Sequence, residues 1–180
     1  MSDIMDTILG RRAVRRYQEK DVPDDLLAKI LEAARWAPSW ANTQPWEFVV
    51  VKDTSIKEKI QKTVAPRNPS SLAILNAPVL LVVCGQLKKS GYYKDEYPTK
   101  FGDWFMFDLG LATENLCLAA HASGLGTVIV GLFDHDSVGK IVKLPNGHEV
   151  LVLIPLGYPD QDPKAPRRKE INEFVYYNTF

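Results

Sequence analysis

The sequence has no net charge, few cysteines and no long hydrophobic segment. Its 180 residues include 22 Lys and Arg balanced by 22 Asp and Glu, so a long-range attraction to nucleic acid or to an anionic membrane is not expected. No apolar run reaches the roughly 18 residues of a membrane-spanning helix, and no apolar core of a signal peptide is present near the start. We therefore expect a cytoplasmic protein that binds neither nucleic acid nor membranes.

Cysteine chemistry is also sparse. Cys84 and Cys117 are the two cysteines, and both stand in apolar stretches without the spacing of a metal site. We predict that they are buried free thiols, with a disulfide or a nucleophilic role as the alternative.

Motifs for several common enzyme chemistries are missing. Gly124-Leu125-Gly126 lacks the third glycine of a dinucleotide-binding fingerprint and follows a predicted helix instead of a strand. The sequence has no P-loop and no serine in a nucleophile elbow. The histidines are scattered and no metal site is expected; we interpret His121 as a helix-end residue. An enzyme with this sequence would therefore depend on a bound cofactor.

Apolar residues alternate between helical and strand periodicity along the chain. Helical spacing predicts helices at about 24–37, 55–63, 103–122 and 134–143, with Pro38 ending the first and Gly124 following the third. Buried strands are predicted at 48–51, 79–84, 127–130 and 150–155. This alternation indicates an α/β or α+β protein with a central sheet covered on both faces, and the length favours one domain over 1–180.

Two polar segments near the start stand out against this pattern. Four arginines lie between Arg11 and Tyr17, and guanidinium groups suit a phosphate or an electron-rich ring edge. The segment Ala37-Pro38-Ser39-Trp40-Ala41-Asn42-Thr43-Gln44-Pro45-Trp46 carries hydroxyl, amide and indole groups between two prolines that favour extended backbone. A solvated face or a nucleic-acid patch would also account for the arginines. Together the two segments indicate a site for a phosphorylated aromatic cofactor.

These segments, together with two later ones, resemble the FMN-dependent nitroreductase family. The later ones are Gly124-Leu125-Gly126-Thr127 and Gly157-Tyr158-Pro159 followed by Arg167-Arg168-Lys169, and all occur in the order of that family, from about Ile4 to Val175. The resemblance implies a nitroreductase-like α+β fold with a central mixed sheet flanked by helices. It also implies an intertwined homodimer with two FMN sites at its interface, each built from both subunits.

The resemblance assigns cofactor-binding roles to individual positions. Arg11 and Arg12 would meet the phosphate and ribityl end of FMN, and Arg15 would lie at the N1 and O2 edge of the ring. Ala13 stands where many relatives have serine. The partner subunit would supply Pro38, Ser39, Trp40 and Asn42. The backbone of Val130, Gly131 and Leu132 would pass over the flavin, with the Gly131 N–H near N5. Arg167 and Arg168 would complete the phosphate site.

The implied activity passes hydride from NADH or NADPH through FMN to a nitroaromatic, quinone or similar aromatic acceptor by a ping-pong mechanism, with no side chain required as a catalyst. Trp40, Trp104 and Phe105 would border the substrate pocket and residues 91–98 would form a lid, although packing within the chain is an alternative role for these aromatics. Other functions remain open: enone reduction, reductive dehalogenation, flavin fragmentation, or a flavin-binding redox module with little turnover.

Overall fold

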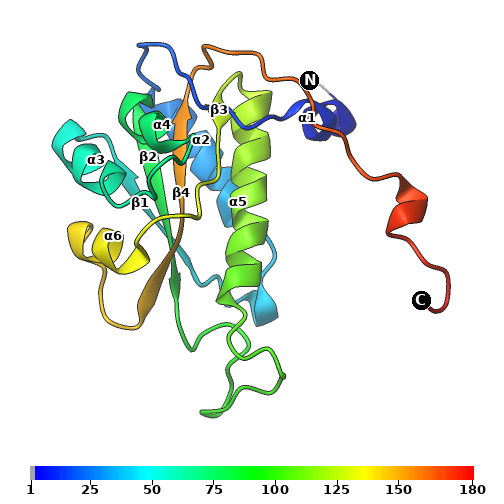
Figure 1. The fold of residues 1–180 in the computed structure, drawn as a ribbon. Helices are drawn as coiled ribbons and strands as arrows, with labels where there is room; N and C mark the ends of the chain where they lie inside the picture. Colours follow the sequence, from blue (N-terminus) through cyan, green and yellow to red (C-terminus); the bar gives the residue numbers. More distant parts are fainter. Residues whose placement is uncertain (1–2) are drawn as a thin grey trace.

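The computed structural model describes residues 3–180 and shows a sheet enclosed by helices (Figure 1). The C-terminal segment after the last strand runs past the first helix and away from the sheet (Figure 1). In chain order the elements are α1 (Ile4–Gly10), α2 (Asp24–Arg35), η1 (Trp40–Asn42), β1 (Trp46–Val51), α3 (Thr54–Gln61), α4 (Ser71–Asn76), β2 (Val79–Gln86), α5 (Phe105–Ala122), β3 (Gly126–Thr127), α6 (His135–Ile141), β4 (His148–Gly157) and η2 (Ile171–Glu173).

The four strands form one sheet in the order β1-β2-β4-β3, and every neighbouring pair is antiparallel. The long central pairing places Val82 opposite Leu153. A parallel contact is present as an isolated bridge between Ala13 and Thr127. The resemblance implies a mixed sheet, and within residues 3–180 this bridge is the only parallel pairing. The α+β arrangement with flanking helices is as predicted.

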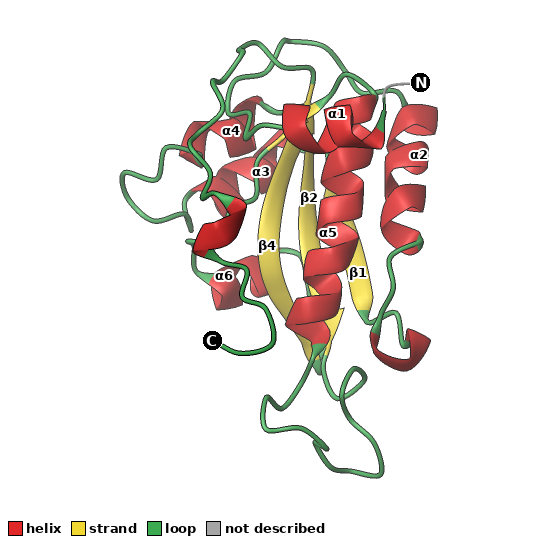
Figure 2. Ribbon diagram, turned by 90° about the vertical axis from the view of Figure 1, so that its right-hand side faces the viewer, coloured by secondary structure: helices red, strands yellow, loops and turns green. Residues whose placement is uncertain are grey.

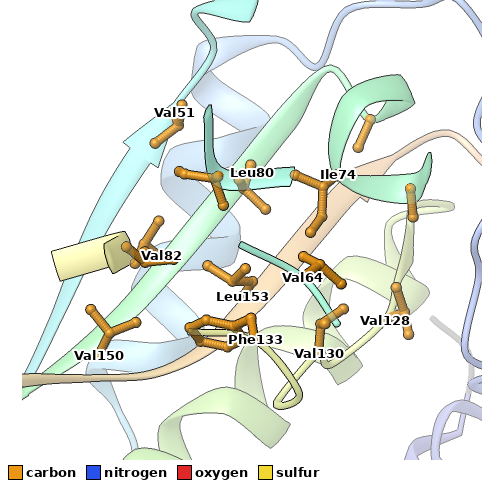
Figure 3. Packing of buried hydrophobic residues seen from close by; sticks show 14 of the residues in the cluster. Val51, Val64, Ile74, Leu80, Val82, Val128, Val130, Phe133, Val150 and Leu153 are labelled. Atoms are coloured by element: carbon orange, nitrogen blue, oxygen red, sulfur yellow. The ribbon is translucent and has the colours of Figure 1, made fainter. Parts of the chain in front are cut away.

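Strand β2 lies at the centre of two hydrophobic cores. Successive side chains of a strand point to opposite faces of the sheet, and every residue from Val79 to Gly85 is buried. Leu80, Val82 and Cys84 face the core under α3, α4 and α6, which is drawn in Figure 3. The residues between them face the core under α2 and α5. Burial on both faces explains why this strand is one continuous apolar run.

Helices α5 and α2 cover one face of the sheet (Figure 2). Helix α5 buries Leu109, Ala112 and Leu116 completely against β2 and β4. It begins at Phe105, two residues later than predicted, and the Phe105 N–H donates to the carboxylate of Asp103 at 3.0 Å. The predicted long helix is thus present, and with 18 residues it is the longest helix in residues 3–180 (Figure 2).

Two short helices and the extent of the third strand differ from the sequence prediction. Helix α1 has seven residues, none of them buried, and α4 has only six, so neither gives a clear apolar period. Strand β3 covers Gly126–Thr127 instead of 127–130. The backbone leaves the ladder after Thr127 and returns for a single bridge between Val130 and Leu153.

The two cysteines are buried in the fold, as the sequence predicts. Cys84 and Cys117 are free and buried, and burial raises the pKa of Cys84 to about 12 and that of Cys117 to about 11. Neither thiol is therefore ionised near neutral pH, as a nucleophile would need to be. In the described part of the chain, no helix is long and apolar enough to cross a bilayer, and no cluster of metal-ligating side chains is found.

Candidate functional site

The arginine-rich segment is extended and is held beside β3. The Val14 N–H donates to the Thr127 carbonyl at 2.9 Å, and Ala13 forms its parallel bridge with the same residue. Val14 and Tyr17 are buried, and the Tyr17 hydroxyl donates to two backbone carbonyl oxygens at 2.6 and 3.1 Å. This close approach requires Gly126, because a Cβ there would lie 2.7 Å from the Val14 side chain. These contacts fix the arginines at one edge of the sheet.

Arg11 and Arg12 line a cavity of about 190 Å³ between α1, the end of α5 and the start of the C-terminal segment. Arg12 Nη1 donates to the carbonyl oxygens of Leu9 at 2.6 Å and Arg11 at 2.8 Å, and so closes the end of α1. Arg11 Nε lies 3.6 Å from a carboxylate oxygen of Glu114, yet it is buried and makes no hydrogen bond. A buried donor without a partner is costly, so Arg11 has unused capacity to bind an anionic group.

A second polar group surrounds Arg15. Arg15 Nε donates to Ser70 Oγ at 2.9 Å. In the same turn, Asn68 accepts the Ser70 N–H at 2.9 Å and donates through Nδ2 to the Leu132 carbonyl at 3.5 Å. The turn therefore joins Arg15 to the backbone of residues 130–132. Sequence reasoning did not find Ser70 or Asn68, and the available signal was only a short polar stretch, 67–70, between two helices.

The backbone at Gly131 leaves the sheet pairing and is open. Val130 exchanges two hydrogen bonds with Leu153, each 2.9 Å long. The next residue, Gly131, is exposed, and a Cβ there would meet no atom within 4 Å. Its N–H has no hydrogen-bond partner in residues 3–180. A free backbone donor thus stands next to the Leu132 carbonyl, at the position that the resemblance assigns to the flavin ring.

The Pro38–Asn42 segment lies at the other end of α5. The Trp40 N–H is 3.2 Å from both carboxylate oxygens of Asp108, in the first turn of that helix. The Trp40 ring lies 5.1 Å from the Trp104 ring, measured between centroids. Two of the three predicted pocket aromatics are therefore in contact.

Three predicted site residues lie outside these groups. Phe105 packs inward, since a Cβ added to Gly85 of β2 would lie 2.5 Å from its ring. Within one chain Phe105 is half-buried and packs against the core, and its place in a substrate pocket stays a prediction. Arg167 and Arg168 are exposed in the C-terminal segment, where neither forms an ion pair or a side-chain hydrogen bond with residues 3–180. Their role at a phosphate also stays a prediction.

One chain does not bring all the predicted residues together. Arg11 and Arg12 share their cavity with His121, in the last turn of α5. Trp40 is bound to Asp108, in the first turn. From Asp108 to His121 the helix rises about 20 Å, at 1.5 Å per residue. The predicted site residues of one chain therefore form two separate groups, one at each end of this helix.

His121 gives a pH-dependent test of the arginine cavity. Burial and the charges of Arg11 and Arg12 lower the pKa of His121 from its usual value near 6.5. The unfolded chain then takes up this proton at higher pH than the folded chain, so the free energy of unfolding decreases as the pH falls below that value. We expect His121→Gln to make this decrease shallower in urea titrations between about pH 7 and pH 5. Identical slopes for the variant and the parent protein would contradict the prediction.

Comparisons with known proteins identify the family of this chain. A model of the Nitroreductase family matches residues 8–75 and 67–158. A protein of Methanothermobacter thermautotrophicus named NADH dehydrogenase/NAD(P)H nitroreductase is 32% identical over 165 residues, which cover 89% of this chain and 80% of that protein. A solved structure from Parabacteroides distasonis with the same name has a TM-score of 0.84 at 27% identity and full coverage of both chains. An iodotyrosine deiodinase bound to FMN and 3-iodo-L-tyrosine has a TM-score of 0.78 at 30% identity, covering 99% of this chain and 100% of its own. The chain therefore belongs to the nitroreductase family.

Proposed function

We propose that the protein is an FMN-dependent oxidoreductase that takes electrons from NADH or NADPH and passes them to an aromatic acceptor such as a nitroaromatic or a quinone. The observation that carries this proposal is the stretch of backbone from Thr127 to Leu132. Arg11 and Arg12 lie beside its start, and Arg15 and the free Gly131 N–H lie near its end. Membership of the nitroreductase family and the FMN-bound relative support it.

The donor set suits the phosphate of FMN. That phosphate is a dianion near neutral pH, and forked guanidinium groups bind such anions through paired, charge-assisted hydrogen bonds. Arg11 keeps a buried Nε without a hydrogen bond, and it lines the same cavity as Arg12. FAD would need a further site for adenosine, and the sequence lacks the third glycine of a dinucleotide fingerprint. The residues present therefore fit a mononucleotide.

When bound, FMN would supply hydride transfer between the nicotinamide and the acceptor. The side chains of the protein would orient that chemistry. Arg15, which Ser70 already holds, would stabilise negative charge at the N1 and O2 edge of the ring. The Gly131 N–H would donate at N5, a role for which no side chain is needed. Trp40 and Trp104 would offer aromatic faces on which a flat acceptor can stack.

A halogenated phenol is a second candidate acceptor. The relative that binds FMN and 3-iodo-L-tyrosine aligns with nearly the whole chain. The aromatic contact between Trp40 and Trp104 would suit a phenol as well as a nitroaromatic ring. The two classes differ in their products, because only the halogenated acceptor releases halide.

We further infer that two chains form each site as a homodimer. The two groups of predicted site residues at the ends of α5 are too far apart to meet within one chain, so a second copy would have to supply the Pro38–Asn42 segment. Apolar side chains are also exposed at both ends of the sequence: Ile4 is 69%, Leu9 65% and Tyr177 84% exposed. Exposed apolar surface of this kind marks an interaction site, and a second copy would cover it.

The central test is chemical identification of the cofactor followed by turnover. We expect purified protein to release FMN in acid, identified by mass spectrometry. Stopped-flow mixing with NADH and with NADPH should bleach the flavin, and nitroaromatic, quinone or iodophenol acceptors should restore its colour. FAD as the chromophore, or no flavin after reconstitution, would refute the cofactor assignment. Bound FMN without turnover would favour a redox module over an enzyme.

Arg15→Ala should lower the two-electron midpoint potential of the bound flavin. A charge-assisted hydrogen bond is worth about 1.5–3 kcal/mol, which corresponds to about 30–60 mV for a two-electron couple. Arg16→Ala is the matched control, because Arg16 is adjacent but exposed and its side chain makes no ion pair or hydrogen bond in residues 3–180. Redox titration against reference dyes measures both. Equal potentials in the two flavin-loaded variants would show that Arg15 points elsewhere.

Flavin should bind only to the dimer. An obligate homodimer buries about 2,000 Å² or more, and a ligand held between subunits stabilises the pair by mass action. In sedimentation velocity, the yellow species should therefore have twice the single-chain mass of 20.2 kDa. A stable flavin-loaded single chain would overturn the two-chain site.

A further inference from the structure

A buried carboxylate, Asp108, connects the segments that carry Trp40 and Trp104. Asp108 is 1% exposed and forms no ion pair within residues 3–180. The Ser90 hydroxyl donates to its Oδ2 at 2.5 Å, and the Trp40 N–H lies 3.2 Å from both carboxylate oxygens. Burying a charge is costly unless hydrogen bonds compensate it. These donors stabilise the carboxylate, and the carboxylate in turn fixes the segments to which they belong.

The Trp40 segment has an unfavourable backbone conformation. Ala41, Asn42 and Gln44 have φ angles of 44°, 56° and 49°, in the left-handed region that disfavours residues with a Cβ. The Gln44 N–H donates to Ser39 Oγ at 2.9 Å, a contact inside the segment itself. The bond from Trp40 to Asp108 differs from it, because it ties the segment to α5. A segment of this kind needs an external anchor to keep one conformation.

The Trp104 side is linked to the same carboxylate through Ser90. The Trp104 N–H donates to the Ser90 carbonyl at 3.0 Å, and the Asp108 N–H donates to the Trp104 carbonyl at 3.2 Å. Ser90 therefore binds Trp104 through its carbonyl and Asp108 through its hydroxyl. The Trp104 indole N–H also donates to Thr99 Oγ1 at 2.8 Å. The resulting contact between the Trp40 and Trp104 rings has a 45° angle between their planes.

We propose that Asp108 is a positioning residue of the acceptor site, which holds Trp40 against Trp104 so that the two rings form a single wall. The inference rests on the proposed function, because the wall acts on catalysis only if an aromatic acceptor binds there. Loss of the anchor would release a strained segment and separate the rings. The KM of the acceptor should then rise by roughly threefold to tenfold, the equivalent of one lost hydrogen bond, whereas the kcat of nicotinamide oxidation should change little.

The test compares two substitutions of similar size. Asp108→Asn keeps an oxygen that can accept the Trp40 N–H, whereas Asp108→Leu keeps the volume and removes every acceptor. The readout is the exciton couplet that two tilted, neighbouring tryptophans produce in the circular dichroism spectrum. The Trp104→Phe variant should lack this couplet, and so assigns it to the pair of Trp40 and Trp104. Thr113→Val is the matched control on the same helix, because the buried Thr113 hydroxyl has no hydrogen-bond partner in residues 3–180.

We expect Asp108→Leu to lose most of the couplet and to raise the KM of the acceptor, while Asp108→Asn and Thr113→Val keep both near the parent values. A couplet retained in Asp108→Leu, or lost equally in the Leu and Asn variants, would overturn the proposal. Ser90→Ala is a milder variant in case the Leu variant does not fold. It should weaken the couplet, and an unchanged couplet and KM would also overturn the proposal.

The couplet is measured without cofactor or substrate, so the positioning role and the proposed function can fail separately. If the parent protein reduces no acceptor but Asp108→Leu loses the couplet, the proposed function is wrong and the contact is purely structural. If acceptor turnover is present and the couplet does not depend on Asp108, the proposed function stands and the positioning role is refuted.

Discussion

The hydrogen bond between the Val14 N–H and the Thr127 carbonyl determines where the arginine segment of this chain lies. It attaches the arginine segment to β3, whose other edge pairs with β4 and hence with the body of the sheet. A slip of one residue along such a contact would exchange the inward and outward side chains, burying an arginine and exposing Val14. Burial of Val14 against Gly126 therefore selects the register that keeps the arginines toward the cavity and the Ser70 turn.

The helices and strands that the sequence predicts correctly are those whose apolar side chains are buried within one chain. Strand β2 is apolar throughout because cores lie on both of its faces. Helix α5 buries residues at helical spacing, including Leu109, Ala112 and Leu116, because one of its sides covers the sheet. Helix α1 gives no such signal, since its apolar residues, including Ile4 and Leu9, face outward. The predicted third strand ends at Thr127 because the backbone leaves the ladder there and returns only for the single bridge between Val130 and Leu153, although the apolar run continues.

The candidate site could be predicted only where a residue type carries its own chemistry. Guanidinium groups suit an anion by their own chemistry, whereas Ser70 gains its role from contact with Arg15, 55 residues earlier in the chain. The bond between Trp40 and Asp108 spans 68 residues and is equally invisible to periodicity. Order in sequence also misleads, since the Arg12 and Trp40 segments are separated along the chain only by α2 and short loops but lie at opposite ends of α5.

The length of α5 sets the distance between the two groups of predicted site residues. The first turn of α5 contacts the Trp40 segment, and its last turn contacts the arginine cavity. Each of these contacts can form whatever the distance between the two ends of the helix. An extra turn within the helix would move the ends apart by about 5.4 Å. In a pair of chains that share their sites, both sites would then be out of register at once, although each chain would still be folded. Insertions are therefore far better tolerated in the exposed stretch 93–98 than in this helix.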